Sequence, residues 1–255
     1  MKSNNIWLFI NTHWLGLFSL IMSFSLIAYS AYLFFSIYQT MKIAEKLVAN
    51  TRPYEQHPQN PDKYILVAGD STALGVGALN MHESTAGRFG EQFPNADITN
   101  LGMNGAMLKD LLITLQNQKN EHYDLIVLQI GANDITHLTS YDAIQEELSK
   151  ILFLSNKISP KTILLTSGNI GAAPVFHWPL STYLTARTLN VRNIFKDEAS
   201  KFKSVFYIDL YKDTKDDPFI KDPERHYAPD SFHLSGDGYE IWFKEIKMQG
   251  HLTNY

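Results

Sequence analysis

The longest apolar stretch of the sequence lies close to its N-terminus. Residues 14–38 are almost entirely apolar, and no Lys, Arg, Asp or Glu occurs between Lys2 and Lys42. About 20 apolar residues in a helix cross the roughly 30 Å hydrocarbon core of a bilayer. We therefore expect one transmembrane helix at about 14–38 within an N-terminal segment 1–40, with Trp14 and Tyr38 near the two membrane surfaces.

Two other interpretations of this stretch remain open. A cleaved signal peptide is the main alternative, because Ala28-Tyr29-Ser30 resembles a cleavage site. Against it, the apolar stretch is longer than the about 7–15 residues that form the apolar core of a signal peptide. A buried core helix is the other, although such a helix rarely lacks a polar face. An uncleaved signal anchor is therefore the expectation.

Beyond residue 62, short apolar runs alternate with amphipathic segments up to about residue 250. The apolar runs predict strands at 64–68, 96–101, 123–130, 162–166 and 205–210. The amphipathic segments predict helices at 84–93, 106–118, 141–158, 181–202 and 235–248. Between the membrane segment and this domain, residues 41–62 are expected to form a connector that starts as a continued helix and ends in a Pro- and Asn-rich spacer.

Regular alternation of strands and helices predicts an α/β fold. We expect a mostly parallel five-stranded sheet between two layers of helices, a three-layer α/β/α sandwich, over residues 63–250. In such sheets, ligands bind at the carboxyl ends of the strands. Polar residues that directly follow a predicted strand are therefore the first candidates for a functional site.

Composition narrows the possible functions. The chain of 255 residues has a formal net charge of −4, which argues against a dedicated nucleic-acid-binding protein. It contains no cysteine, which excludes disulfide scaffolds, Cys-ligated metals and a cysteine nucleophile. No histidine pair has the spacing of a helical metal site. We expect no metal and no cofactor.

Three predicted strands run into small or polar residues. The first is followed by Gly69-Asp70-Ser71, which can present a hydroxyl group to the crevice or merely cap a helix. The second runs into the block 100–105, which contains two glycines and can be a ligand-binding loop or a simple turn. The third ends in Gly131-Ala132-Asn133-Asp134, where Asn133 can point an amide into the crevice or cap the next helix.

A fourth block, Asp230-Ser231-Phe232-His233, precedes the last predicted helix. Three residues of separation on a loop allow the Asp230 carboxylate to reach one ring nitrogen of His233. The other ring nitrogen can then face a serine hydroxyl group. These two residues are candidates for the acid and the base of a Ser-His-Asp arrangement.

Together and in this order, the four blocks resemble the SGNH (GDSL-type) hydrolase family of serine esterases. The resemblance covers roughly residues 63–250, and Thr72 stands where the family's name-giving motif has Leu. It implies a flavodoxin-like parallel sheet. It also implies that Ser71 is the nucleophile, that His233 is the general base and that Asp230 orients His233.

The same resemblance implies an oxyanion hole. Its donors would be the backbone N–H groups of Ser71 and Gly105 and the side-chain amide of Asn133. Gly102 competes for the glycine role, but its spacing from Asn100 is less favourable.

Several other residues are weaker candidates for the functional site. Asp209, at the end of the fifth predicted strand, is a rival for the triad acid, although a strand-end carboxylate is more often a cap. Asp70 and Asp134 are expected to accept hydrogen bonds from backbone N–H groups. The segment 169–180, with Phe176, His177 and Trp178, either walls the substrate pocket or packs on the surface.

The resulting prediction is a membrane-anchored serine hydrolase that cleaves carboxylic esters through an acyl-enzyme. The substrate would be a lipid ester or an O-acetylated sugar, with the membrane as a partner and no nucleic acid. Two alternatives are an acyltransferase on the same fold and a non-catalytic, membrane-tethered binding module. The charges that flank the apolar stretch favour a cytoplasmic domain, whereas anchored enzymes of this family more often face outward, which is the side we expect.

Overall fold

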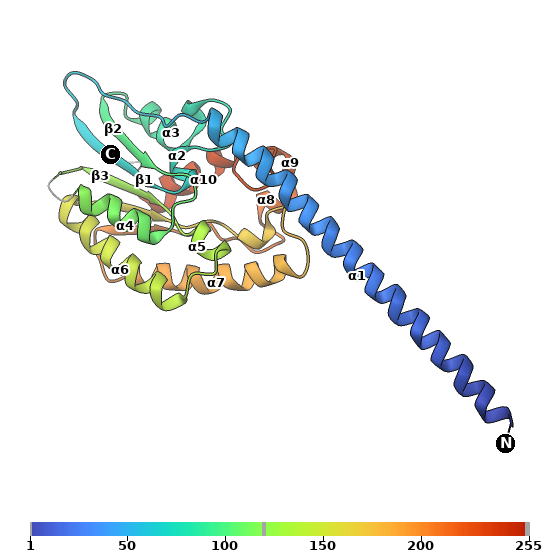
Figure 1. Cartoon of the computed structure of the whole chain (residues 1–255). Coiled ribbons are helices and arrows are strands. Elements are labelled where there is room, and N and C mark those ends of the chain that lie inside the picture. The colour runs from blue at the N-terminus through green and yellow to red at the C-terminus, as the bar shows by residue number, and fades with distance from the viewer. Residues whose placement is uncertain (1, 119–120, 253–255) are drawn as a thin grey trace.

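The computed structural model describes residues 2–118 and 121–252, with side chains from Trp14 onward (Figure 1). One long helix, α1 (Lys2–Asn50), extends away from an α/β domain that holds the remaining elements. The domain contains five strands that alternate with helices along the chain. This agrees with the alternation predicted from the sequence.

The sheet is parallel throughout its five strands. Its strands follow the order β2-β1-β3-β4-β5, in which β1 pairs with β2 and β3 on its two sides. This is the flavodoxin-like order, in which β2 is added on one side of β1 and the later strands are added on the other, so that the strand order switches between β1 and β3. The strands are β1 (Lys63–Gly69), β2 (Ala96–Gly102), β3 (Leu125–Gln129), β4 (Thr162–Leu165) and β5 (Val205–Ile208). The predicted fold class is confirmed.

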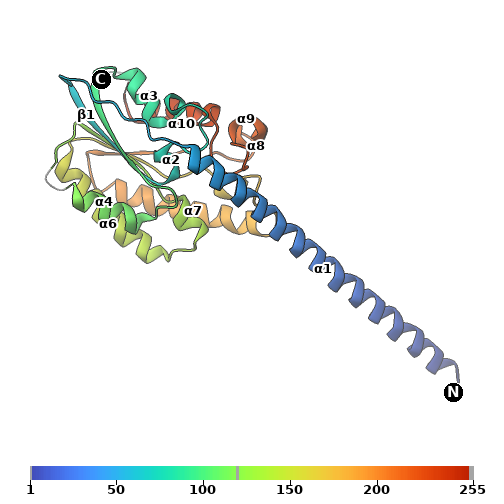
Figure 2. The same ribbon diagram turned by 45° about the horizontal axis from the view of Figure 1, so that its top comes forward.

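Helices cover both faces of the sheet (Figure 2). On one face pack α4 (Leu108–Asn117), α6 (Tyr141–Ile158) and α7 (Leu180–Ala199). On the other face pack α3 (Thr85–Gln92) and α10 (Gly236–Gln249). These five helices match the five amphipathic segments predicted from the sequence to within a few residues.

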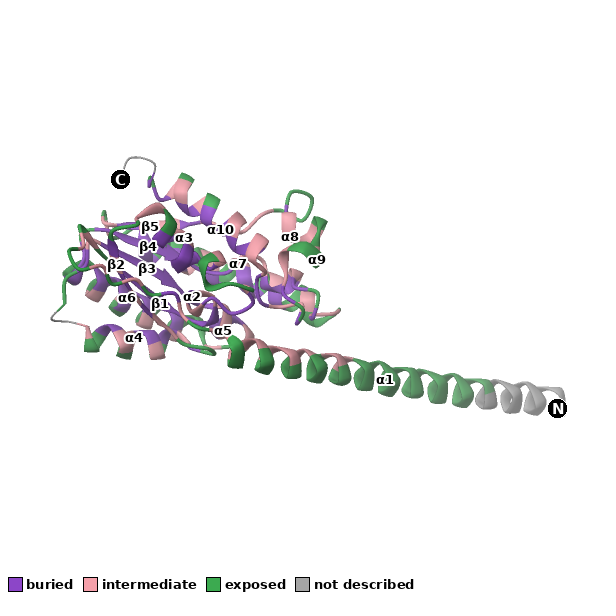
Figure 3. Cartoon of the chain, turned by 90° about the horizontal axis from the view of Figure 1, so that it is seen from above, coloured by how far each residue is buried: buried purple, intermediate pink, exposed green. Residues whose placement is uncertain are grey.

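The core consists of two apolar layers separated by the sheet. The strands between them are largely buried (Figure 3). In β1, Leu66 and Ala68 belong to one layer, whereas Ile65 and Val67 belong to the other, because successive side chains of a strand point to opposite faces. Both layers are sealed from water, which explains why β1, β3 and β4 read as nearly continuous apolar runs, whereas the edge strand β2 alternates between buried and half-buried residues.

Short helices that the periodicity did not predict follow several strands. α2 (Ser71–Leu74) begins directly after β1, and α5 (Ala132–Thr136) begins after β3. The two remaining short helices are α8 (Pro218–Lys221) and α9 (Pro223–His226). Two 3₁₀ turns are η1 (Met81–Glu83) and η2 (Ile170–Ala172). With three to five residues each, they are too short to show a helical period.

Helix α1 continues without a break well beyond the apolar stretch. From Trp14 to Ala28 its side chains are exposed, whereas one face, which includes Leu33 and Ile43, becomes half-buried further on. α1 is long and apolar enough to cross a membrane, a test that a signal sequence would also pass. After α1 the chain packs onto the domain: Tyr54 is buried, and the backbone of Gln56 pairs with that of Ile98.

Candidate active site

Ser71 follows the carboxyl end of β1 and is the first residue of α2. The turn depends on Gly69, which has a φ of +146°, and a Cβ there would lie 1.8 Å from the carbonyl oxygen of Gln129. Asp70 then caps α2, because its carboxylate accepts hydrogen bonds from the Thr72 N–H at 2.8 Å and from the Thr72 hydroxyl group at 2.7 Å. The threonine that departs from the family motif therefore has a partner of its own.

His233 faces Ser71 from the loop between α9 and α10. Its Nε2 lies 3.0 Å from the Ser71 Oγ, and its Nδ1 lies 2.5 Å from the Asp230 Oδ2. The second carboxylate oxygen of Asp230 accepts the backbone N–H groups of Phe232 and His233, at 3.1 and 2.9 Å. The structure thus brings together the hydroxyl group, the imidazole and the carboxylate, in an arrangement that can pass a proton from Ser71 to His233.

Asp230 and Asp70, the two aspartates near this pair, have pKa values that are shifted in opposite directions. Burial raises the pKa of Asp230, but hydrogen bonds and the charge of His233 outweigh it and hold this pKa below its usual value. Burial also raises the pKa of Asp70, to about 6, because only Thr72 and the nearby His233 oppose it. Asp230 is therefore ionised at neutral pH and can stabilise a positively charged His233.

The loop that carries His233 is held against the chain segment that follows Ser71. Gly77 has a φ of +94°, and a Cβ there would lie 2.3 Å from the Leu234 carbonyl oxygen and 3.2 Å from the His233 Cβ. The buried Tyr239 of α10 donates a hydrogen bond to the carbonyl oxygen of Val76, at 2.9 Å. No sequence pattern predicts this contact, because it depends on residues far apart in the chain.

Asn133, in the first turn of α5, lies near the loop that contains Gly105. The Asn133 side-chain amide donates a hydrogen bond to the carbonyl oxygen of Ala106, at 3.0 Å. Gly105 has a φ of +75°, and a Cβ there would meet nothing within 4 Å, so this part of the loop faces open space. Asn133 lines the pocket at Ser71 and His233, whereas Gly105 lies outside its lining.

Gly102, the rival of Gly105, has a different role. Its N–H donates to the Asn100 side chain at 2.9 Å and is therefore occupied. A Cβ at Gly102 would lie 2.3 Å from the Leu74 backbone nitrogen, so this glycine allows β2 and α2 to approach. Asn100 in turn donates to the Ala73 carbonyl oxygen at 3.0 Å.

A buried arginine supports the Asn133 segment. Arg187 of α7 is 6% exposed, and its guanidinium donates hydrogen bonds to the carbonyl oxygens of Ile135, Asp134 and Thr139. The carboxylate of Asp134 accepts the Leu108 N–H at 3.0 Å, at the start of α4. The expected role of Asp134 is confirmed, whereas no sequence signal distinguished Arg187 from an ordinary surface arginine.

The pocket at Ser71 is small and largely apolar. It offers an accessible volume of about 60 Å³, several times the roughly 10–15 Å³ that one water molecule needs. The side chains that give it its character are Ile170, Leu210, Phe219, Phe232 and Trp242. Ser167 also lines it, and its buried hydroxyl group has no hydrogen-bond partner among the described residues. The space suits a short acyl group better than a long chain.

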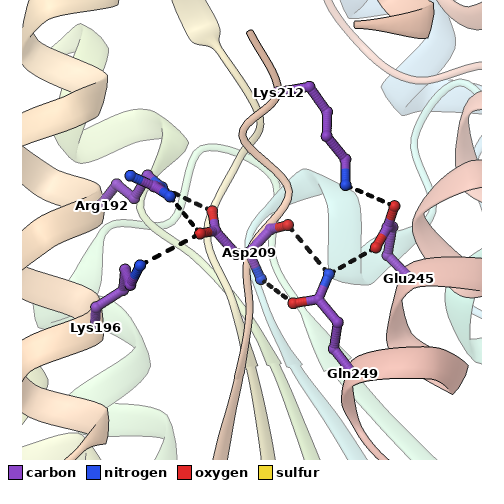
Figure 4. A network of polar contacts seen from close by, with 6 residues as sticks. All are labelled: Arg192, Lys196, Asp209, Lys212, Glu245 and Gln249. Atoms are coloured by element: carbon purple, nitrogen blue, oxygen red, sulfur yellow. Dashed lines mark hydrogen bonds and ion pairs between the residues drawn. The ribbon is translucent and has the colours of Figure 1, made fainter. Parts of the chain in front are cut away.

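Asp209, the rival for the acid, belongs to a separate polar network (Figure 4). Its carboxylate is bound by Arg192 and lies 3.6 Å from the Lys196 Nζ, while its backbone N–H donates to Gln249 at 2.9 Å. Burial raises the pKa of Asp209, but the hydrogen bonds and charge of Arg192 lower it further. Asp209 therefore ties β5 to α7 and α10, and His233 takes Asp230 as its partner.

The segment 169–180 contributes to the pocket through its beginning. Ile170 and Ala173 line the pocket, whereas Phe176 packs against Phe232 with ring centroids 5.7 Å apart. His177 lies beside Tyr32 of α1, and Trp178 is 70% exposed. None of these three aromatic residues lines the pocket itself. Phe176 lies behind the pocket-lining Phe232, whereas His177 and Trp178 lie at the outer end of the segment.

Residues 67–241 match the model of the GDSL-like Lipase/Acylhydrolase family. The chain belongs to this family. The GDSL-like lipases and acylhydrolases are hydrolases that act on esters, and the match includes Ser71 and His233. No curated protein gives a significant match to the sequence.

Solved structures have the same fold as this GDSL-like hydrolase. A lipolytic G-D-S-L family protein from Veillonella parvula is 18% identical, with a TM-score of 0.56 over 72% of this chain and 96% of that one. A variant of Axe2, an acetyl xylan esterase from Geobacillus stearothermophilus, is 17% identical, with a TM-score of 0.54 over 74% and 95%. TesA is 14% identical, with a TM-score of 0.57 over 73% and 97%.

Proposed function

We propose that this GDSL-like hydrolase cleaves carboxylic esters by way of an acyl-enzyme formed on Ser71. The observation that carries the proposal is the 3.0 Å distance between the Ser71 Oγ and the His233 Nε2, with Asp230 on the other ring nitrogen. A serine hydroxyl group needs an adjacent base to become a nucleophile at neutral pH.

In the proposed reaction the Ser71 Oγ attacks the acyl carbon while His233 accepts its proton. The negative charge that develops on the carbonyl oxygen is stabilised by the N–H groups of Ser71 and Gly105 and by the Asn133 amide. His233 then gives the proton to the leaving alcohol. A water molecule then attacks the acyl-enzyme while His233 accepts its proton, and His233 returns that proton to the Ser71 Oγ as the bond to the acyl group breaks and the acid leaves.

The dimensions of the pocket support a short acyl group such as acetyl. One of the similar solved structures is of an acetyl xylan esterase, in agreement with this size. We further propose that α1 anchors the enzyme in a membrane, with the catalytic domain on the external side. The substrate would be an O-acetylated sugar or a lipid ester.

The test is hydrolysis of p-nitrophenyl esters, from acetyl to decanoyl, by the full chain in detergent micelles. Wild type should hydrolyse the short esters, and Ser71→Ala should lose this activity. Ser200→Ala, at an exposed serine at the end of α7, serves as the matched control. Equal and negligible turnover by wild type and Ser71→Ala would favour the non-catalytic module, and transfer to an added alcohol in preference to water would favour the acyltransferase.

A further inference from the structure

Residues 173–183, which border the pocket and include the first turn of α7, also contact α1, the helix that we propose enters the membrane. These residues are called the segment below. The Tyr29 hydroxyl group of α1 donates a hydrogen bond to the Trp178 carbonyl oxygen, and the ring of Tyr32 lies 5.6 Å from that of His177. In Figures 1 and 3, α1 leaves the domain beside α2, on the side where α5, α8 and α9 also lie. The membrane helix therefore emerges at the edge of the sheet that holds the site.

The length of α1 places this contact at the surface of a bilayer. From Lys2 to Tyr29 the helix rises about 40 Å, at 1.5 Å per residue. A bilayer with its headgroup regions is roughly 40–45 Å thick. If Lys2 lies at one surface, Tyr29 and the segment beside it lie in the interfacial region of the other. This span lies nearer the N-terminus than the 14–38 expected from the sequence, because the contacts of Tyr29 and Tyr32 with the domain leave only the preceding part of α1 to cross the bilayer.

The segment has the side chains that an interfacial region accepts. Trp178 is 70% exposed, Tyr183 is 52% exposed and Leu180 is 38% exposed. Between Lys161 and Arg187 the sequence contains no Lys, Arg, Asp or Glu. Trp and Tyr prefer the headgroup level of a membrane, and the absence of charge removes the main cost of entering it.

The same segment leads to the reacting groups. The Val175 N–H donates to the Ser231 carbonyl oxygen at 3.4 Å, and Phe176 packs against Phe232. Phe232 lines the pocket and lies 5.2 Å from the ring of His233. A pocket too small for a long chain thus lies beside a surface suited to lipid.

We propose that residues 173–183 lie in the interfacial region of the bilayer that α1 enters, and that the pocket takes short-acyl esters carried by amphiphiles of that bilayer. The second part rests on the proposed esterase activity. The first part concerns only where the segment lies. An amphiphile could keep its apolar portion in the bilayer while its ester enters the pocket.

The position of the segment is tested on the full chain in phosphatidylcholine vesicles. The chain has no cysteine, so Trp178→Cys carries a single environment-sensitive fluorophore, and Tyr64→Cys carries it on a half-exposed residue at the opposite end of the sheet. Lipids spin-labelled near the headgroup should quench the fluorophore at 178 at least threefold more strongly than that at 64. Equal quenching at the two positions would overturn the proposal.

The substrate class is tested with a pair of fluorogenic acetates that share one reacting group. One is soluble methylumbelliferyl acetate, and the other carries a long alkyl chain in place of the methyl group and is held in the vesicles. Trp178→Ser should slow hydrolysis of the embedded acetate about tenfold, the effect of losing one large apolar contact, and leave the soluble one within twofold. Equal effects on both would reject the proposal, whereas failure of wild type on both would reject the esterase function and leave the quenching result unaffected.

Discussion

The hydroxyl group of Tyr239 donates a hydrogen bond to the carbonyl oxygen of Val76, 2.9 Å away and 163 residues earlier in the chain. Tyr239 is completely buried, and burial raises its pKa well above the usual value, so the hydroxyl group stays protonated. This bond joins α10 to the turn that follows Ser71. It therefore fixes the two halves of the proposed catalytic pair relative to each other.

Tyr239→Phe tests this bond. The substitution leaves a buried carbonyl oxygen without its donor, which costs about 1–3 kcal/mol of the free energy of unfolding. The measurement is urea denaturation followed by circular dichroism. Tyr64→Phe, at a half-exposed tyrosine, is the control and should change the stability little. An unchanged midpoint for Tyr239→Phe would show that the bond adds nothing.

Gly77→Ala and Gly105→Ala form a matched pair of glycine substitutions. Both positions have a positive φ, so both variants bear a backbone cost of roughly 1–2 kcal/mol. Only at Gly77 would the new methyl group meet a backbone oxygen, at 2.3 Å, whereas at Gly105 it meets open space. Gly77→Ala should therefore unfold at clearly lower temperature than Gly105→Ala and lose more esterase activity. Equal thermal midpoints would contradict the close contact with Leu234.

Asp70→Asn should alter how stability depends on pH. The pKa of Asp70 in the folded protein is about 6, against 3.8 for an unperturbed Asp, so the folded state holds the proton more tightly. The contribution of Asp70 to the free energy of unfolding is therefore fully present at low pH and is lost as pH rises from about 4 to about 6. The variant should gain on the order of 2–3 kcal/mol relative to wild type over that range. A constant difference between the two, measured by denaturation at pH 4 to 7, would contradict the raised pKa.

Asn133→Ala addresses the proposed oxyanion hole. Loss of one preorganised donor should lower kcat about 10²–10³-fold, because the charge appears on the carbonyl oxygen only during the reaction. The variant's KM for p-nitrophenyl acetate should change much less than its kcat. Asn190→Ala, at an exposed asparagine of α7, is the control. A kcat within a factor of three of wild type would remove Asn133 from the mechanism.

Asp230→Asn and Asp209→Asn distinguish the two candidate acids. The first removes the carboxylate on the Nδ1 of His233 and should lower kcat by about 10⁴. The second weakens the contact with Arg192 and should lower the stability while leaving kcat within about twofold. Comparable losses of kcat in both variants would mean that Asp209 also acts on the site.

The sequence predicted the fold well where packing imposes a simple pattern. The strands β1 and β3 are buried on both faces and read as apolar runs, and α6 shows a regular amphipathic period over 18 residues. The short helices were missed because four or five residues cannot show a period. The extension of α1 to Asn50 was predicted only in part, since its second half is no longer uniformly apolar.

The proposed reacting groups were also found from sequence, because Ser71 and Asn133 directly follow strands and His233 stands three residues from Asp230. Their supports were not. Arg187 contacts carbonyl groups of α5 and of the turn after it, about 50 residues earlier, and Gly77 touches a loop near the other end of the domain. Contacts of this kind depend on how the layers pack, which no local pattern records.

The parallel sheet has one further consequence. Ser71 follows its first strand, and His233 precedes the last helix, so the two groups meet only while α10 is docked. Partial opening of that helix separates them although the strands stay paired. In a denaturant titration, turnover should therefore disappear at a lower denaturant concentration than the β-sheet signal does. Loss of activity then indicates that α10 has detached from the sheet.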